Sequence, residues 1–129
     1  MIINISVSLG ELVDKISILQ IKRKNIRDKE KEKLINKELS LLEKSLKDSL
    51  NDNLIIKYLD ELIKINSKLW KIEDDLRENE RKKIFDQDFI ELARSVYFAN
   101  DERAELKSKI NKILKSNIIE IKQYDNYKI

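Results

Sequence analysis

The near absence of glycine and proline is the feature that most constrains the fold of this chain. Its 129 residues include one glycine and no proline, so the two residues that most often interrupt helices and form tight turns are almost missing. Charged residues make up 40% and hydrophobic residues 41% of the sequence, a balance that is typical of long amphipathic helices. A chain of this length is expected to form one core. We therefore predict a single, mainly all-α domain over residues 1–129.

The missing residue types also exclude several kinds of chemistry. Without cysteine or histidine, the chain has no thiolate nucleophile, no Cys-ligated zinc site and no imidazole general base. The single glycine, Gly10, excludes a P-loop and a G-x-G-x-x-G dinucleotide-binding motif. A bound metal would have to be a hard ion such as Mg²⁺ or Mn²⁺, held by carboxylates.

The charge and hydropathy patterns narrow the expected surroundings of the protein. The 27 basic and 24 acidic residues give a net charge of +3, which is too mild to indicate a nucleic-acid-binding protein. No apolar run approaches the ~20 residues of a membrane span. The apolar residues 1–7 lack the basic region of a signal peptide. We expect a cytoplasmic protein that binds neither membranes nor nucleic acid.

Apolar periodicity and capping residues divide the chain into four helices. Ser8 with Glu11, and Asp88 with Glu91, have the spacing of a capping box, and Asp28 can cap another helix. Short connections make consecutive helices antiparallel neighbours. We predict an up-down antiparallel four-helix bundle or a pair of helical hairpins. The expected helices cover residues 8–27, 29–50, 53–82 and 88–115.

Two short segments are expected to form strands. In residues 1–7, Ile3, Ile5 and Val7 alternate with polar residues, which is typical of a half-buried strand. Residues 118–122 have a similar strand-like pattern close to the other terminus. We predict that the two segments pair as a small two-stranded β-ribbon that joins the termini.

The third and fourth helices carry polar residues where a buried stripe would be apolar. In the fourth helix, steps of four and three residues lead to Asn100, Arg103 and Lys107 in the middle of a stripe with apolar ends. The same spacing in the third helix leads to Asn66 and Glu73. The stripe of the second helix has no polar interruption. Polar groups on a buried face are costly unless they are paired, so these residues should have a structural or functional role.

The expected antiparallel arrangement brings these polar residues together. Asn66 should lie level with Arg103, because the third and fourth helices form a hairpin. The first helix is apolar almost all round, so its Asp14 and Lys15 should lie in a sheltered place near Lys107. The predicted ligand-binding residues, including those that flank the two polar stripes, are Asp14, Lys15, Trp70, Glu73, Arg77, Arg94, Tyr97, Asn100, Arg103 and Lys107.

The residue types in this cluster suit a phosphorylated ligand. Arginine and lysine hold phosphate or carboxylate groups through charge-assisted hydrogen bonds, and Trp70 or Tyr97 can stack a base or a sugar ring. A purely structural interpretation is equally open. Asparagines within a buried stripe can fix the register of neighbouring helices, and glutamate and arginine can satisfy each other as an ion pair. Lys107 can extend its ammonium group outward to solvent. Asp74 and Glu78 have a spacing that can share a divalent ion, but such pairs are typical of a solvated helix face.

Residues 8–19 read S-L-G-E-L-V-D-K-I-S-I-L. They resemble the opening S-x-G-E-L-x-D-K-I-x-I-L of an uncharacterised family of small helical bacterial and phage proteins, a domain of unknown function. The resemblance continues at residues 70–74, in F-I-E-L-A-R-S-V-Y at 89–97 and in N-D-E-R-A at 100–104. It covers nearly the whole chain and implies one domain, with no established activity. The polar residues of these family motifs coincide with those that interrupt the two apolar stripes.

Three kinds of function are compatible with these residues. The first, which we expect, is a module that binds a small anionic ligand such as a nucleotide or sugar phosphate, in the manner of a phage-type nucleotide-sequestering protein without a cofactor. The second is a structural or interaction protein whose polar stripe specifies a homodimer or a partner helix, and we expect a homo-oligomer. The third is a Mg²⁺-dependent nucleotide pyrophosphohydrolase. Its paired acidic motifs are only partly matched by Glu11 with Asp14 and by Glu73 and Asp74 with Glu78.

Overall fold

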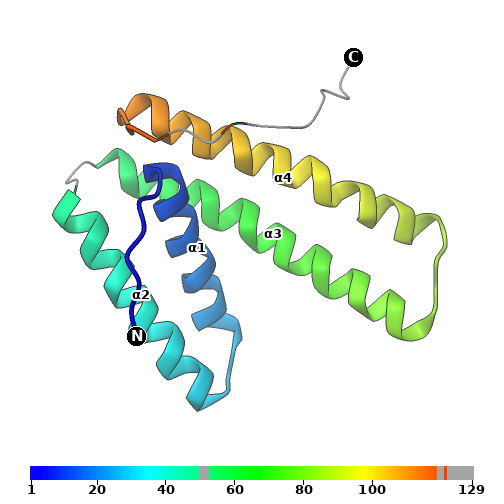
Figure 1. Ribbon diagram of the computed structural model, residues 1–129. Coiled ribbons are helices and arrows are strands. Elements are labelled where there is room, and N and C mark those ends of the chain that lie inside the picture. Colours follow the sequence, from blue (N-terminus) through cyan, green and yellow to red (C-terminus); the bar gives the residue numbers. More distant parts are fainter. Residues whose placement is uncertain (50–52, 119–120, 122–129) are drawn as a thin grey trace.

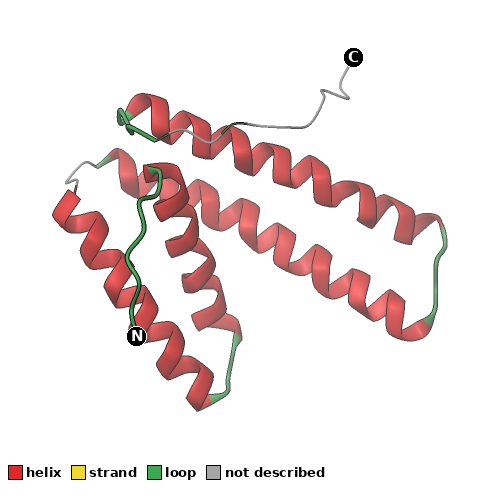
Figure 2. Ribbon diagram, viewed as in Figure 1, coloured by secondary structure: helices red, strands yellow, loops and turns green. Residues whose placement is uncertain are grey.

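The computed structural model describes residues 1–49, 53–118 and 121. These residues form four α-helices, which Figure 1 labels in chain order and Figure 2 separates from the loops. No strand occurs among them. The prediction of a mainly all-α fold is therefore confirmed. The helices are α1 (Leu9–Asn25), α2 (Lys29–Ser49), α3 (Leu54–Lys82) and α4 (Gln87–Ile113).

Side-chain caps begin α1 and α2 at the predicted residues. The Ser8 hydroxyl accepts a hydrogen bond from the Glu11 backbone N–H at 3.1 Å. Asp28 Oδ1 accepts from the backbone N–H groups of Glu30 at 2.9 Å and Lys31 at 3.3 Å. These bonds satisfy N–H groups that have no partner inside the helix.

The predicted cap of α4 is wrong by two residues. Asp86, not Asp88, is the N-cap, and its side chain accepts from the Phe89 backbone N–H at 3.1 Å. The backbone of Asp86 is extended, as an N-cap requires, whereas Asp88 already lies in the first helical turn. There its carboxylate still complements the positive end of the helix dipole.

The predicted β-ribbon is also wrong. Residues 1–7 form a loop in which Val7 packs against the core between α1 and α2. Of the second predicted strand, 118–122, Ile118 and Ile121 belong to no strand, and the other three positions lie outside the described residues. Of the three alternating apolar residues, only Val7 packs on the core, whereas Ile3 and Ile5 are exposed.

The central element is α1. It lies against α2, α3 and α4, and α3 lies against α4, whereas α2 has only α1 as a neighbour within the described part of the chain. Figure 1 shows one hairpin of α1 and α2 and a longer hairpin of α3 and α4, which diverge from the end where α1 begins. A closed bundle would place α2 beside a second helix. Of the two predicted arrangements, the structure has the paired hairpins.

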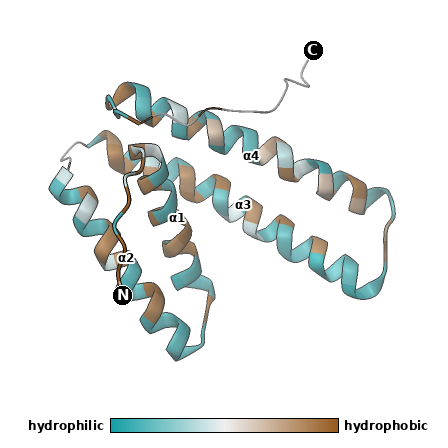
Figure 3. Ribbon diagram, in the orientation of Figure 1, coloured by the Kyte–Doolittle hydropathy of each residue, from teal (hydrophilic) through white to brown (hydrophobic). Residues whose placement is uncertain are grey.

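Two apolar clusters form the core, and α1 contributes to both. One lies within the α1–α2 hairpin, and the other joins α1 to the α3–α4 hairpin. Consecutive residues of α1 face different clusters, so apolar residues occur on more than one side of this helix. Figure 3 colours the four helices by hydropathy. The α1–α2 cluster consists of Leu12, Ile16, Leu19, Ile35 and Leu39. The cluster between α1 and the α3–α4 hairpin consists of Val13, Ile55, Tyr58, Leu62 and Ile110.

Gly10 allows α1 and α4 to approach each other closely. A Cβ atom at this position would lie 2.5 Å from the Lys107 carbonyl oxygen, which is far inside van der Waals contact. The Gly10 N–H donates to Asn111 Oδ1 at 2.7 Å. The only glycine of the chain therefore stands where a side chain would separate two helices.

Candidate ligand-binding site

Asp14 lies at the centre of the polar contacts between α1, α3 and α4. Its side chain has no solvent exposure. The carboxylate accepts hydrogen bonds from Arg103 Nε at 2.9 Å and Arg103 Nη2 at 2.5 Å, and from Asn66 Nδ2 at 2.9 Å. A two-pronged bond of this kind matches the planar guanidinium to the carboxylate. One buried charge thus joins three helices.

Ser17 extends this network along α1. Its buried hydroxyl donates to the Asp14 carbonyl oxygen at 2.6 Å and accepts from Asn66 Nδ2 at 2.7 Å. Asn66 Nδ2 therefore donates to two acceptors on α1. The spacing of polar residues along α3 and α4 predicted Asn66 beside Arg103, but it did not predict a role for Ser17. Its position three residues after Asp14, on the same face of the helix, could have indicated that it belongs to the same network.

A second ion pair lies about one turn further along α4. Lys107 Nζ is 2.7 Å from Glu11 Oε2, and the Lys107 side chain is only 10% exposed. Lys107 therefore does not extend into solvent. The Glu11 side chain, which a capping box would direct to Ser8, reaches across to α4 instead. Neither residue lines the pocket described next.

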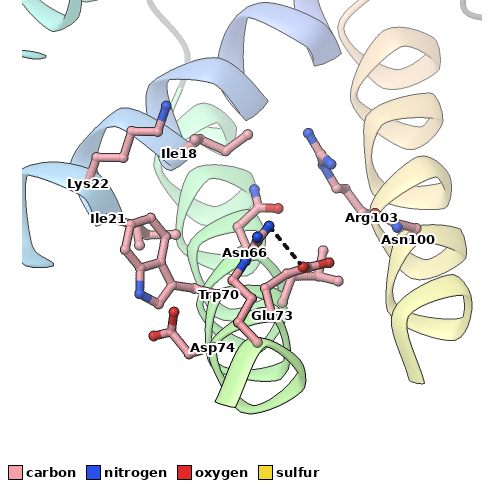
Figure 4. A pocket seen from close by; sticks show the side chains of 11 residues that line it. Ile18, Ile21, Lys22, Asn66, Trp70, Glu73, Asp74, Asn100 and Arg103 are labelled. Atoms are coloured by element: carbon pink, nitrogen blue, oxygen red, sulfur yellow. Dashed lines mark ion pairs between the residues drawn. The ribbon is translucent and has the colours of Figure 1, made fainter. Parts of the chain in front are cut away.

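A pocket of about 490 Å³ opens beside the Asp14 network, where α1 diverges from α3 and α4. This volume lies within the range of small-molecule sites. Figure 4 shows the side chains that line the pocket. The apolar and aromatic lining consists of Ile18, Ile21, Leu69 and Trp70. The polar lining consists of Lys22, Asn66, Glu73, Asp74, Arg77, Asn100 and Arg103.

Three helices contribute cations to this pocket. Lys22 comes from α1, Arg77 from α3 and Arg103 from α4, against two carboxylates, Glu73 and Asp74, from α3. Arg77 Nη2 is 3.5 Å from Glu73 Oε2, the pair marked by a dashed line in Figure 4. Arg103 is held by the buried carboxylate. The buried carboxylate thus positions the Arg103 guanidinium, which reduces the entropic cost of binding a ligand to it. The Arg77 side chain is 71% exposed, so its surface ion pair restricts it less.

Four other side chains in the lining have polar groups without a partner in the part of the chain that the structure describes. Among the described residues, no hydrogen bond or ion pair involves the side chain of Lys22, Asp74 or Asn100, or the indole N–H of Trp70. They come from all three helices around the pocket. A ligand here would meet an ammonium group, a carboxylate, an amide and an indole N–H that no protein contact engages.

The structure brings half of the predicted ligand-binding residues into this pocket. Trp70, Glu73, Arg77, Asn100 and Arg103 all line it. A sixth residue of the predicted set, the fully buried carboxylate on α1, lies behind Arg103 and positions it. The antiparallel register expected from the sequence therefore agrees with the observed contacts of α3 and α4.

The other predicted residues lie elsewhere. Lys15 is exposed on α1, and Lys107 is buried in the second ion pair. Arg94 lies nearer the α3–α4 turn, 3.3 Å from Glu91, and a hydrogen bond with Tyr97 together with the Glu91 charge raises the pKa of its guanidinium. Arg94 and Tyr97 were selected because they flank the stripe of α4, but both lie closer to the α3–α4 turn than the pocket residues Asn100 and Arg103 do.

Two charged residues of the pocket, Lys22 and Asp74, were not among the predicted ligand-binding residues. Lys22 belongs to a basic run at the end of α1, where cations complement the helix dipole, so this position gave no reason to select it. Lys22 follows Ile18 by four residues, and this spacing could have indicated that both residues lie on the same face of α1. The sequence suggested only metal-binding roles for Asp74, with Glu78 and with Glu73. No group of three or more His, Cys, Asp or Glu side chains in the described part of the chain is placed to hold a metal ion.

The fold and the site define an all-helical protein with a partly charged pocket between two helical hairpins. The chain belongs to a family of unknown function (DUF6165), which it matches over residues 1–128. No curated protein and no solved structure matches it. Among the described residues, no helix combines the length and the apolar character that crossing a membrane requires.

Proposed function

We propose that this protein is a small-ligand binding module that holds a phosphorylated anion, a nucleotide or a sugar phosphate, in the pocket between its hairpins. The observation that carries this proposal is Arg103, which lines the pocket while Asp14 fixes its guanidinium. Arg77 and Lys22 line the same pocket, and guanidinium and ammonium groups suit phosphate oxygens. Trp70 offers a face for a base or a sugar ring. Sequestration of a nucleotide by such a phage-type module would need no catalytic group.

Thermal melting in the presence of inorganic phosphate, ribose 5-phosphate, AMP, CMP and UMP tests this proposal. A bound ligand stabilises the folded state by about 2.7 kcal/mol at a hundredfold excess over its Kd. We expect at least one phosphorylated compound to raise the melting temperature. Stabilisation by none of them would overturn the proposal.

Two arginines of α3 provide a matched pair of variants for this experiment. Arg77 and Arg81 both pair with glutamates on the surface of α3, but only Arg77 lines the pocket. Arg77→Ala should reduce the ligand-dependent shift, whereas Arg81→Ala should leave it unchanged. Equal effects of the two substitutions would assign the shift to general charge screening rather than to the pocket.

A second candidate function, self-association, is favoured by the far end of the α3–α4 hairpin. This end extends beyond α1 (Figure 1) and exposes large apolar side chains. Two copies of a two-helix hairpin can bury such residues by forming a four-helix arrangement. The last turn of α3 is basic and the first turn of α4 is acidic. A symmetric pair with α3 of one copy beside α4 of the other would bring these opposite charges together. The exposed apolar residues are Ile84, Phe85, Ile90 and Tyr97.

The Mg²⁺-dependent pyrophosphohydrolase alternative gains no support from the side-chain geometry. Glu11 pairs with Lys107, and the Asp14 carboxylate is engaged by Arg103 and has no exposure. Neither carboxylate lines the pocket. The acidic pair that would open the first metal-binding motif is therefore used to hold helices together.

A further inference from the structure

Asp74 stands at an exposed position of α3, and its carboxylate adds a negative charge to the rim of a pocket proposed to bind an anion. Asp74 lines the pocket without a hydrogen-bonding or ion-pair partner among the described residues. An unpaired carboxylate repels phosphate and weakens binding by like-charge repulsion. A ligand that overcomes this effect must donate a hydrogen bond to Asp74 as well as present an anion to the cations.

Trp70 lies beside the Asp74 carboxylate in the part of the pocket wall that α3 forms. Trp70 and Asp74 are four residues apart on α3, so their side chains lie on the same face one turn apart. Figure 4 shows the Trp70 indole between the side chains of Lys22 and Asp74. A planar ring stacked on the indole would therefore have one edge towards an ammonium group and the other towards a carboxylate.

Asn100 and Arg103 face this wall from α4 (Figure 4). The Asn100 amide has both a donor and an acceptor and no side-chain partner in the part of the chain that the structure describes. It can therefore contact a sugar hydroxyl or a base edge. Arg103 adds a fixed cation on the same side for the phosphate.

We infer that, if the proposed function holds, the pocket selects a nucleoside monophosphate whose base carries an exocyclic amino group. The phosphate lies towards Lys22 and Arg103, the base stacks on Trp70, and the amino group donates to Asp74. Cytosine and adenine present such a group, whereas uracil presents a carbonyl oxygen in its place. Free phosphate and ribose 5-phosphate lack the base altogether and should bind more weakly.

The test compares CMP with UMP, which differ at the ring position that would face Asp74. Trp70 is the only tryptophan of the chain, so quenching of its fluorescence reports directly on stacking in the pocket. We expect CMP and AMP to quench it and to bind about tenfold more tightly than UMP, as a hydrogen bond to a charged group implies.

Two neighbouring aspartates give matched variants. Asp74→Ala should weaken CMP binding about tenfold and remove its advantage over UMP. Asp75→Ala should change neither ligand, because Asp75 pairs with Lys71 on the surface and does not line the pocket. Both substitutions place a good helix former within α3, and unchanged melting temperatures of the ligand-free variants would confirm that the fold is retained.

The possible outcomes separate this inference from the proposed function. If CMP and UMP bind with equal affinity, or if Asp74→Ala leaves the CMP preference intact, the selection by Asp74 is overturned while the anion-binding module stands. The same holds if ribose 5-phosphate binds as tightly as CMP. If no phosphorylated compound binds, the proposed function and the selection by Asp74 are both overturned.

Discussion

Asp14 of α1 and Arg103 of α4 form a two-pronged ion pair in which the carboxylate is fully buried and the guanidinium is 27% exposed. The pair has two roles because its carboxylate is buried while its guanidinium is partly exposed. Its buried side joins helices, and its exposed side contributes to the pocket wall. The proposed ligand binding would therefore be linked to stability through one arginine, and substitutions that separate the two effects are informative.

Replacing Asp14 should destabilise the protein strongly. Asp14→Ala removes the carboxylate that Arg103 and Asn66 bond to, and breaking a buried pair leaves a charge without compensation. We expect a loss of about 3 kcal/mol in the free energy of unfolding, the lower end of the usual range, because Arg103 retains some contact with water. Urea denaturation measures this loss. Asp60→Ala, at an exposed position of α3, should change stability by less than about 0.5 kcal/mol. Similar losses for the two variants would show that the buried pair is unimportant.

Gly10→Ala should also be destabilising, although alanine is the better helix former. The new methyl carbon would lie 2.5 Å from the Lys107 carbonyl oxygen, a backbone atom that cannot rotate away. Overpacking of this kind costs about 1–3 kcal/mol and outweighs a helix-propensity gain of about 1 kcal/mol. The Gly10 N–H bond to Asn111 should lengthen at the same time.

Thermal melting is the measurement for this substitution. Ser40→Ala, at an exposed position of α2, provides a control in which helix propensity changes without a steric conflict. We expect a lower melting temperature for Gly10→Ala and an unchanged or slightly higher one for Ser40→Ala. A rise for Gly10→Ala would mean that α1 and α4 can separate at little cost.

These contacts also show why the sequence predicted some features and not others. Helix positions and the level of Asn66 relative to Arg103 follow from periodicity and short connections, which are local properties. The packing of α2 on α1 alone depends on how two hairpins meet, and no local pattern specifies that angle. Lys22 enters the pocket for the same reason. A β-ribbon was predicted from alternation at 1–7, but alternation does not show whether a strand partner is available.

The pKa of Glu78 gives a prediction about pH. A hydrogen bond and the charge of Arg81, with a further contribution from Lys82, hold the pKa of the Glu78 carboxyl below its ordinary value. A lowered pKa stabilises the folded state above the ordinary pKa, and this contribution is lost as the pH falls through the lowered value. The effect on stability should be small, because Glu78 lies at the surface.

Titration of Glu78 by NMR tests this assignment. Arg81→Ala should return the pKa of Glu78 towards its ordinary value, whereas Arg77→Ala should not, because Arg77 pairs with Glu73 one turn earlier. An unchanged titration in Arg81→Ala would contradict the assignment. The same two variants serve the ligand experiment with opposite expectations, so general effects of removing an arginine can be recognised.

Self-association can be tested at Ile90, which is 47% exposed on the far part of the α3–α4 hairpin. Ile90→Asp should turn a dimer into a monomer in light scattering, because an aspartate buried in an apolar interface has no partner. The fold should tolerate the change, since the position is exposed and an acidic residue near the start of α4 complements the helix dipole. Leu34→Asp, at a 69% exposed position of α2, should leave the dimer intact. A wild-type protein that is monomeric at all concentrations would refute self-association and would leave the pocket as the feature to explain.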